Sequence, residues 1–229
     1  MHPHHRWKIR SIFARELGNL YWMDFVRPIE AIVPGAQGRV LAVLAETTAE
    51  LNLRSIAQLA EISQAQTSRL LPELVDLGVV ERREVPPASL FRIVPEHIAS
   101  RALLALARSA DAVLDEMGRL ARALPHPPAS VIVFGSFARR EADTHSDIDV
   151  VIVRPTEIDE DDDEWLDSLD TWRRAVRRLS GNVVEVLDVS TDEATAKLRG
   201  RSQVWTDIRR GGQVVHGLSI DELRDARGG

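Results

Sequence analysis

The sequence predicts an α+β protein of two domains: a helical N-terminal domain with a β-hairpin and a C-terminal α/β domain with a small mixed sheet. Three observations lead to this prediction. Apolar residues recur at helical spacing in the first half of the chain, and short β-branched runs typical of buried strands recur in the second half. A proline-rich segment at 125–128 lies between the two, and proline both ends a helix and stiffens a linker.

The 229 residues are enough for two hydrophobic cores. We divide the chain into an amphipathic N-terminal segment at 1–35, the helical domain at 36–97, one long connecting helix at 98–124, the α/β domain at 125–217 and a frayed tail at 218–229. The first segment is rich in aromatic residues. It therefore either packs on the helical domain or forms the contact of a homodimer.

The helical domain is predicted to contain three helices followed by two strands. The helices are expected at 37–48, 52–60 and 63–77, and the strands at 79–85 and 90–94. Ser63 and Gln66 have the spacing of a capping box, which marks the start of the third helix. Gly78 follows that helix and ends it.

This order of elements resembles the winged helix-turn-helix of MarR-like regulators. The segments that carry the resemblance are Leu53-Arg-Ser-Ile-Ala-Gln-Leu-Ala60 and Leu77-Gly-Val-Val-Glu-Arg82. The exposed side of the third helix is expected to offer polar groups to base edges in a major groove: Gln64, Gln66, Thr67, Ser68 and Arg69. Three arginines of the wing are expected to meet phosphates: Arg82, Arg83 and Arg92.

The charge of this module leaves its partner open. Residues 36–97 contain six arginines and eight acids, whereas strong DNA-binding modules usually carry a basic surface. The module therefore binds either duplex DNA or protein, the latter through dimerisation or docking on the second domain. The chain has no cysteine and no apolar run long enough for a membrane span, so we expect a protein of the reducing cytoplasm without a membrane partner.

The α/β domain begins with the most informative segment of the chain. Residues 131–134 form a buried strand, Gly135 permits a tight turn, and Ser136 is expected to cap a helix that runs to Glu141. A second strand covers 147–153. Because side chains alternate along a strand, Asp147 and Asp149 are expected on one face, roughly 7 Å apart.

Two carboxylates in this arrangement can bind a pair of Mg²⁺ ions, which prefer carboxylate, water and phosphate oxygens. The amide groups at the start of the helix suit a phosphate. The alternative is a solvated turn that carries two surface acids.

The remaining elements follow from the same patterns. The acidic run at 157–164 is predicted to be a solvated loop that leads into a helix at 165–179, whose apolar face covers the sheet. Residues 182–189 are predicted to form a strand with two acids, Glu185 and Asp188, on opposite faces. A helix ends near residue 210 and a last short strand covers 213–216.

The pattern Gly135-Ser136, ten residues and then Asp147-Ile148-Asp149 resembles the signature of the DNA polymerase β-like nucleotidyltransferases. The most similar branch is that of the minimal nucleotidyltransferases, in which glycine is common where this chain has Arg140. The resemblance implies a third carboxylate on a later strand. Glu185 is the candidate, although the family usually has aspartate there.

The resemblance further implies transfer of a nucleoside monophosphate from a nucleoside triphosphate, first of all ATP, to a hydroxyl acceptor. It implies that Asp147, Asp149 and Glu185 are catalytic and hold two Mg²⁺ or Mn²⁺ ions. The nucleotide-binding residues it implies are Gly135, Ser136 and Arg139. Minimal members of the family include antitoxins that modify a partner toxin and enzymes that modify small molecules.

Two other functions remain open at the level of sequence. In the first, the chain is a winged-helix transcription regulator whose transferase-like domain senses nucleotide or is catalytically silent. In the second, it belongs to a toxin–antitoxin pair and its winged helix binds a partner protein.

Overall fold

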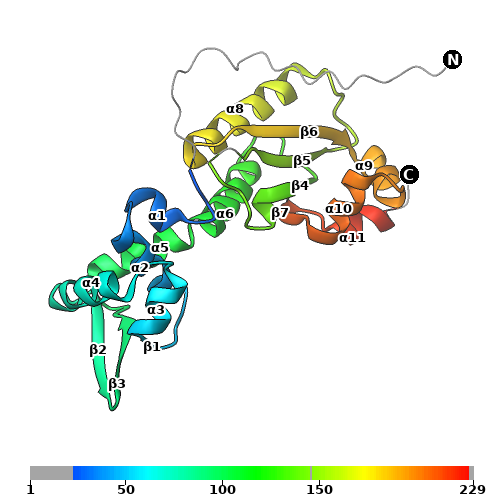
Figure 1. Cartoon of the computed structure of the whole chain (residues 1–229). Coiled ribbons are helices and arrows are strands. Elements are labelled where there is room, and N and C mark those ends of the chain that lie inside the picture. The colour runs from blue at the N-terminus through cyan, green and yellow to red at the C-terminus, as the bar shows by residue number, and fades with distance from the viewer. Residues whose placement is uncertain (1–22, 145, 227–229) are drawn as a thin grey trace.

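The computed structural model describes residues 23–144 and 146–226, which form a helical N-terminal domain and an α/β C-terminal domain (Figure 1). The predicted α+β class with small sheets is confirmed. The elements of the N-terminal domain are α1 (Pro28–Ile32), α2 (Ala36–Ala45), β1 (Leu51–Asn52), α3 (Leu53–Leu59), α4 (Gln64–Asp76), β2 (Val80–Val85), β3 (Ala88–Ile93) and α5 (Ile98–Ala107).

The local signals of the N-terminal domain are observed as predicted. The Ser63 hydroxyl accepts a hydrogen bond from the Gln66 amide, and the Gln66 side chain accepts one from the Ser63 amide, so the capping box of α4 is complete. Strands β2 and β3 form an antiparallel hairpin. A third strand, β1, pairs with β3 and was not predicted, because its two residues are too few for a periodic pattern.

The connecting segment differs from the prediction of one long helix. It consists of α5 and a separate α6 (Ser109–Arg122), which meet at Arg108, a residue with φ −100° and ψ 16°. The break has a physical reason, since the two helices serve different cores. Leu103 and Leu104 of α5 pack in the N-terminal core, whereas Val113 and Met117 of α6 are buried in the C-terminal core.

The C-terminal domain surrounds a four-stranded mixed sheet of order β6-β5-β4-β7, in which only β5 and β6 are parallel. Its remaining elements are β4 (Ser130–Phe134), α7 (Gly135–Ala138), β5 (Ile148–Arg154), α8 (Asp163–Ser180), β6 (Val184–Ser190), α9 (Thr191–Arg199), α10 (Gln203–Gly211), β7 (Gln213–Gly217) and α11 (Ile220–Asp225).

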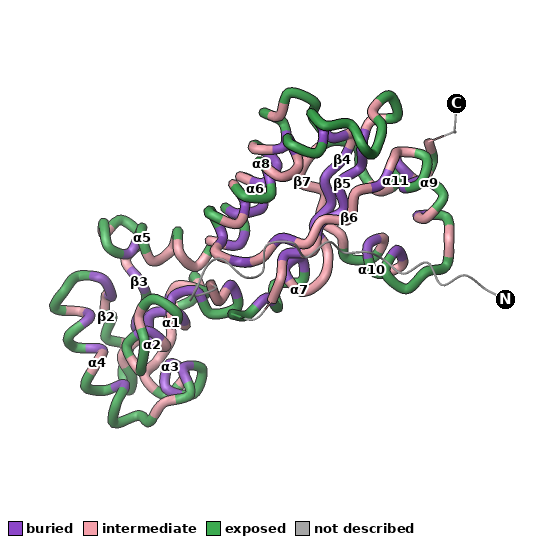
Figure 2. Tube along the Cα trace, turned by 90° about the horizontal axis from the view of Figure 1, so that it is seen from above, coloured by how far each residue is buried: buried purple, intermediate pink, exposed green. Residues whose placement is uncertain are grey.

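The sheet is covered on both faces, which gives the domain three layers (Figure 2). Ile148, Val150 and Ile152 of β5 point towards α6 and α8, where Trp165 and Trp172 are also buried. The alternate residues Val151 and Val153 of β5 point towards α9, α10 and α11 on the other face, in a second cluster with Trp205 and Ile208. Because side chains alternate along the strands, the C-terminal domain has one hydrophobic cluster on each face of its sheet.

The last residues before 226 are helical, in contrast to the frayed tail that was predicted. Helix α11 is capped by Ser219 and Glu222, and its Leu223 is fully buried. Thr195 of α9 donates a hydrogen bond to the Leu223 carbonyl at 2.7 Å, which ties α11 to the domain.

The predicted N-terminal amphipathic segment lies mostly outside the described residues, but its end is observed. Phe25 belongs to the C-terminal core, where its ring meets Phe137 edge-on at a centroid distance of 5.0 Å. Ile29, four residues later, is buried in the N-terminal core. This short segment therefore contributes a buried side chain to each domain. None of the helices in the described part of the chain combines the length and apolar character that a membrane crossing requires.

Candidate active site

The acids singled out from the sequence lie at one end of the C-terminal sheet. Asp149 of β5 has Glu185 of β6 as its parallel neighbour and Phe134 of β4 as its antiparallel neighbour. Neighbours in register share a face of the sheet, so Glu185 lies beside Asp149. Asp147 comes directly before β5 and two residues before Asp149. The structure thus brings Asp147, Asp149 and Glu185 to the same end of the sheet.

Gly135 is required at this site by its backbone and by its neighbour. Its φ of +71° lies in the left-handed region that favours glycine. A Cβ atom at this position would also lie 2.3 Å from the Asp149 Oδ2 atom, closer than any real contact. The turn after β4 therefore brings the main chain directly against the Asp149 carboxylate, which only glycine allows.

The carboxylates repel one another in a partly buried environment. Burial raises the pKa of Asp149, and the charges of Asp147 and Glu185 raise it further, while Arg139 opposes them. Burial also raises the pKa of Asp147. Among the described residues, no hydrogen bond or ion pair involves the side-chain carboxylates of Asp147, Asp149 or Glu185. The site is therefore a cluster of acids without a neutralising ion pair from the described chain.

The acids do not converge on a single point. Within residues 23–144 and 146–226, no group of three or more histidine, aspartate or glutamate side chains is arranged to hold a metal ion.

The turn after β4 is shorter than predicted. Helix α7 ends at Ala138 rather than at Glu141, and its N-cap is Phe134 with no capping bond from a side chain, so the expected capping role of Ser136 is wrong. The reason is the tight turn at Gly135, which starts the helix two residues earlier than predicted. Arg139 is half exposed and forms an ion pair with Glu141 at 2.8 Å.

Arg140 occupies a left-handed backbone position, with φ +62°. This is the residue that stands where the resembled family commonly has glycine. The departure from the family pattern therefore carries a conformational cost, since residues with a Cβ rarely adopt this region. The Arg140 side chain pairs with Asp111 of α6 across the surface.

Asp188, the other acid of β6, lies on the opposite face from Glu185 and has a structural role. Its Oδ2 atom accepts hydrogen bonds from Arg154 at 2.7 Å and from the Trp165 indole at 3.1 Å. Arg154 is itself 5% exposed. This pair joins β5, β6 and α8, away from the three acids.

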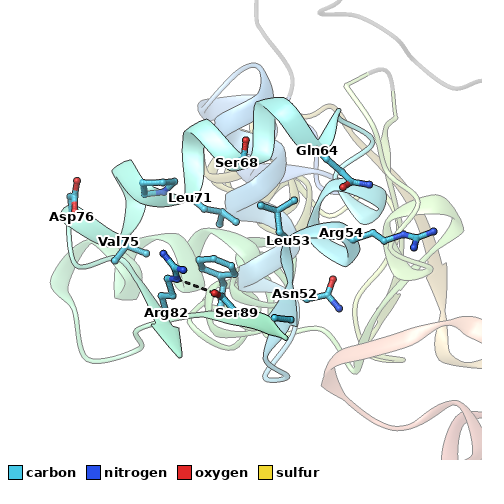
Figure 3. Close-up of a pocket in the computed structure, with 13 residues that line it drawn as sticks. Asn52, Leu53, Arg54, Gln64, Ser68, Leu71, Val75, Asp76, Arg82 and Ser89 are labelled. Carbon is cyan, nitrogen blue, oxygen red and sulfur yellow. Dashed lines mark hydrogen bonds between the residues drawn. The ribbon is translucent and has the colours of Figure 1, made fainter. Parts of the chain in front are cut away.

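The N-terminal domain carries a separate groove of about 610 Å³ between α4 and the hairpin (Figure 3). Two residues predicted to contact DNA, Gln64 and Ser68, lie on the helix wall of this groove. Arg54 of α3 also lines the groove and was not predicted, because the apolar pattern of this helix indicates only its inward face. Leu71 and Phe91 form part of its apolar base.

The predicted DNA-binding set of α4 is only partly at the surface. Thr67 is fully buried and donates its hydroxyl hydrogen to the Ser63 carbonyl, so the prediction that Thr67 faces a groove of DNA is wrong. Thr67 lies on the same buried face of α4 as Leu71 and Leu74. Gln66 is exposed, but its side chain is engaged in the capping box. Arg69 is exposed.

The three predicted wing arginines are all paired with acids. Their partners are Glu84 and Ser89 for Arg82, Glu50 for Arg83 and Glu81 for Arg92. The hydrogen bond from Arg83 holds the pKa of Glu50 below its usual value. The wing therefore presents neutralised rather than free positive charge. The acids responsible were visible in the sequence, but their pairing depends on strand register.

Comparison with known families gives two matches. Residues 38–84 match the IclR helix-turn-helix domain, and residues 113–194 match the nucleotidyltransferase domain, within which Gly135, Asp147, Asp149 and Glu185 lie. Both agree with an N-terminal helix-turn-helix joined to a nucleotidyltransferase domain, which confirms the recognition made from the sequence. The matching helix-turn-helix model is of the IclR type, whereas the sequence segments resembled MarR-like regulators.

The chain is also similar to solved structures. One is a toxin–antitoxin with AMP-PNP, at 16% identity and a TM-score of 0.34, and another is a mutant of the toxin–antitoxin MntA–HpeT, at 14% identity and a TM-score of 0.34. Each likeness covers 48% of this chain and 80% of the other chain. A comparison with curated proteins finds no match.

Proposed function

We propose that the chain is a divalent-metal-dependent nucleotidyltransferase that moves a nucleoside monophosphate from a nucleoside triphosphate to a hydroxyl acceptor. The observation that carries the proposal is the placement of Asp147, Asp149 and Glu185 at one end of the sheet, against the Gly135 turn. The match of residues 113–194 to the nucleotidyltransferase domain supports it.

The donor set fits Mg²⁺ or Mn²⁺, which prefer carboxylate oxygens completed by water and phosphate oxygens. Asp147, Asp149 and Glu185 would hold the ions, and we propose two. A like-charged, partly buried cluster with no internal ion pair is costly unless cations join it. When bound, such ions stabilise the attacking and leaving oxygens of a phosphoryl centre together.

In the proposed reaction the acceptor oxygen forms a bond to the α-phosphorus. The bond between this phosphorus and the bridging oxygen breaks, and pyrophosphate leaves with that electron pair. Glu185 lies beside Asp149 on the edge strand β6 and takes the hydroxyl proton. The Gly135 turn and the Ser136 hydroxyl would orient the triphosphate. Arg139, whose charge acts on Asp149, would offset part of the triphosphate charge.

Label transfer tests this proposal. The purified chain is incubated with Mg²⁺, cell extract and ATP, GTP, CTP or UTP labelled at the α-phosphate. The wild type should label an acceptor, with ATP the first candidate, and Asp149→Asn should reduce labelling by at least about 100-fold, the scale of a lost transition-state interaction. Asp167→Asn, the same change at an exposed position of α8, is the matched control and should label as the wild type does. Equal labelling by Asp149→Asn and the wild type would reject the proposal.

A second candidate function is favoured by the spacing of the acids. Because the described acidic side chains do not converge on one ion, the domain could bind nucleotide without transferring it. In that case the chain is a transcription regulator whose helix-turn-helix reads duplex DNA through Gln64, Ser68 and Arg69. Selection of bound duplexes by the Asp147→Asn, Asp149→Asn double variant separates the two candidates. Specific operator binding by the double variant at the affinity of the wild type would favour the regulator.

The partner of the helix-turn-helix is proposed to be duplex DNA in both candidates, since the matched module is of a DNA-reading type. Because the wing arginines are paired with acids, this binding is expected to be weak. Binding to duplexes at low salt tests it directly. A chain that binds no duplex and instead copurifies with one protein would assign the module to a protein partner, as in a toxin–antitoxin pair.

A further inference from the structure

One fully buried polar side chain lies next to the acids and has no role in the reaction as proposed. Asn182 follows the glycine that ends α8 and comes two residues before β6. Its side chain is completely excluded from solvent. Buried amide groups are usually fully hydrogen-bonded, so its contacts indicate why it is there.

The amide nitrogen of this side chain holds the main chain directly before Asp147. Its Nδ2 atom donates a hydrogen bond to the Ser146 carbonyl at 2.9 Å. On the other side of Asp147, the Ile148 amide donates to the Val183 carbonyl at 2.8 Å. The two peptide groups that flank Asp147 are therefore both fixed to consecutive residues of the β6 side.

The register explains why a side chain makes the first of these bonds. The parallel ladder of β5 and β6 starts at the pair Ile148 and Val184, and two residues earlier it would place Ser146 opposite Asn182. The regular strands have not yet begun there, so the side-chain amide continues the ladder in place of the backbone. Ser146 also closes the preceding turn, because its hydroxyl donates to the Asp143 carboxylate at 2.9 Å.

The oxygen of the Asn182 side-chain amide, in contrast to its nitrogen, is destabilising. Its Oδ1 atom is buried and has no hydrogen-bond partner in the described structure. An unsatisfied buried acceptor destabilises the fold, whereas an apolar side chain of similar size would avoid the penalty. The bond to Ser146 is the contact that distinguishes Asn182 from such a side chain.

We infer that Asn182 is a positioning residue that fixes the Asp147 carboxylate beside Asp149 for divalent-metal binding. The inference rests on the proposed function, because it assigns Asn182 to the metal site of that reaction. Groups that orient metal ligands from outside typically change metal affinity by 10–100-fold when they are removed.

The test is the affinity for Mn²⁺ in the presence of a non-hydrolysable ATP analogue, measured by calorimetry on the full chain. Asn182→Ala should raise the half-saturating Mn²⁺ concentration about tenfold. In a transfer assay, activity should return towards the wild-type value at saturating Mn²⁺. The matched control is Ser130→Ala, which removes a single hydrogen bond, to the Leu218 carbonyl at 2.7 Å, from a fully buried side chain at the opposite end of β4.

The control separates positioning from stability. Both variants should lower the melting temperature, but only Asn182→Ala should weaken Mn²⁺ binding. Equal Mn²⁺ affinities for the two variants and the wild type would overturn the inference. If Asn182→Ala does not fold, Asn182→Ser keeps a hydroxyl donor and should shift the affinity in the same direction.

Failure of the proposed function can be distinguished from failure of the inference about Asn182. If the wild-type chain binds Mn²⁺ with the analogue but transfers no label, the transferase proposal is rejected. The role of Asn182 is then still tested by the change in Mn²⁺ affinity. A wild-type chain that binds no Mn²⁺ would overturn both.

Discussion

At the scale of single residues, the backbone of Arg140 carries a cost that the sequence pattern alone did not reveal. The resembled family commonly has glycine at this position, and the structure gives a reason in the φ of +62°. An L-residue in this region costs roughly 1–2 kcal/mol. Arginine in place of glycine at position 140 therefore adds backbone strain as well as a charged side chain.

Replacing Arg140 tests this cost. Arg140→Gly and Arg140→Ala both remove the ion pair with Asp111, but only glycine relieves the left-handed backbone. We expect the glycine variant to be more stable than the alanine variant by about 1 kcal/mol. Chemical denaturation of the two variants measures the difference. An alanine variant at least as stable as the glycine variant would show that the position carries no strain.

A second prediction concerns the repulsion among the acids. The folded pKa of Asp149 lies above its ordinary value of 3.8, so its ionised form opposes folding. The penalty is complete at pH values above the raised pKa and disappears as the pH falls through it towards the ordinary value. Asp149→Asn removes the charge.

Without metal, Asp149→Asn should therefore stabilise the chain at pH 7 by roughly 0.2–1 kcal/mol, the range for charged pairs on neighbouring strands. The gain should shrink as the pH is lowered. Mn²⁺ with an ATP analogue should raise the melting temperature of the wild type and leave that of the variant unchanged. Thermal unfolding at several pH values checks this, and a variant less stable than the wild type at pH 7 would refute it.

At the scale of elements, the wing is the part of the N-terminal domain whose electrostatics most affects function. Each wing arginine is paired with an acid, and two of these acids, Glu50 and Glu81, belong to the segment before β1 and to β2. Removing the acids should free arginines for phosphates. Replacing these two acids should therefore convert the wing from a neutral surface to a basic one.

We expect the Glu50→Gln, Glu81→Gln double variant to bind duplex DNA more tightly than the wild type. Its plot of log affinity against log salt should be steeper by about 1 for each arginine that reaches a phosphate. Fluorescence anisotropy over a range of salt concentrations measures both. Glu46→Gln, an exposed change of the same charge, is the control and should have a smaller effect. An unchanged salt dependence in the double variant would show that the wing does not contact DNA.

Elements with local signals could be predicted from the sequence, whereas those that depend on distant partners could not. The start of α4 was predicted because Ser63 and Gln66 lie within one turn. Strand β1 was missed because its two residues are held by pairing with β3. The same capping pattern is present at the starts of α9 and α11, so these helices could have been found with the signal used for α4.

The candidate site also has parts that local sequence patterns predict and parts that depend on distant segments. Alternation along one strand predicts Asp147 and Asp149 on one face, and because Asp147 comes directly before β5, its facing stays a prediction. The position of Glu185 beside Asp149 depends on the register of β5 against β6, which no local pattern determines. The contact between Asn182 and Ser146 spans 36 residues and was not predicted for the same reason.

At the scale of the whole molecule, two cores are joined by a short segment and by α5 and α6. Phe25 enters the C-terminal core and its amide donates to the Ala142 carbonyl at 3.1 Å, next to the turn that carries the candidate site. Ile29 enters the N-terminal core. The two-domain α+β organisation was correctly predicted from the pattern of helical and β-branched segments, but the way one segment serves both cores was not.

The two cores should respond separately to mutation. Ile29→Ala should destabilise the N-terminal domain by roughly 2–5 kcal/mol, and Phe25→Ala should destabilise the C-terminal domain by roughly 3–5 kcal/mol. Differential scanning calorimetry should show that each variant lowers a different transition. If both variants lowered one common transition by the same amount, the chain would unfold as a single cooperative unit.

The account depends on whether the acids at this end of the sheet form a metal–triphosphate site. The most direct measurement is anomalous diffraction from crystals of the full chain soaked with Mn²⁺ and a non-hydrolysable ATP analogue. Mn²⁺ peaks beside the carboxylates of Asp147, Asp149 and Glu185, with the triphosphate against the Gly135 turn, are the predicted result. Mn²⁺ bound elsewhere, or a triphosphate away from these acids, would contradict the account.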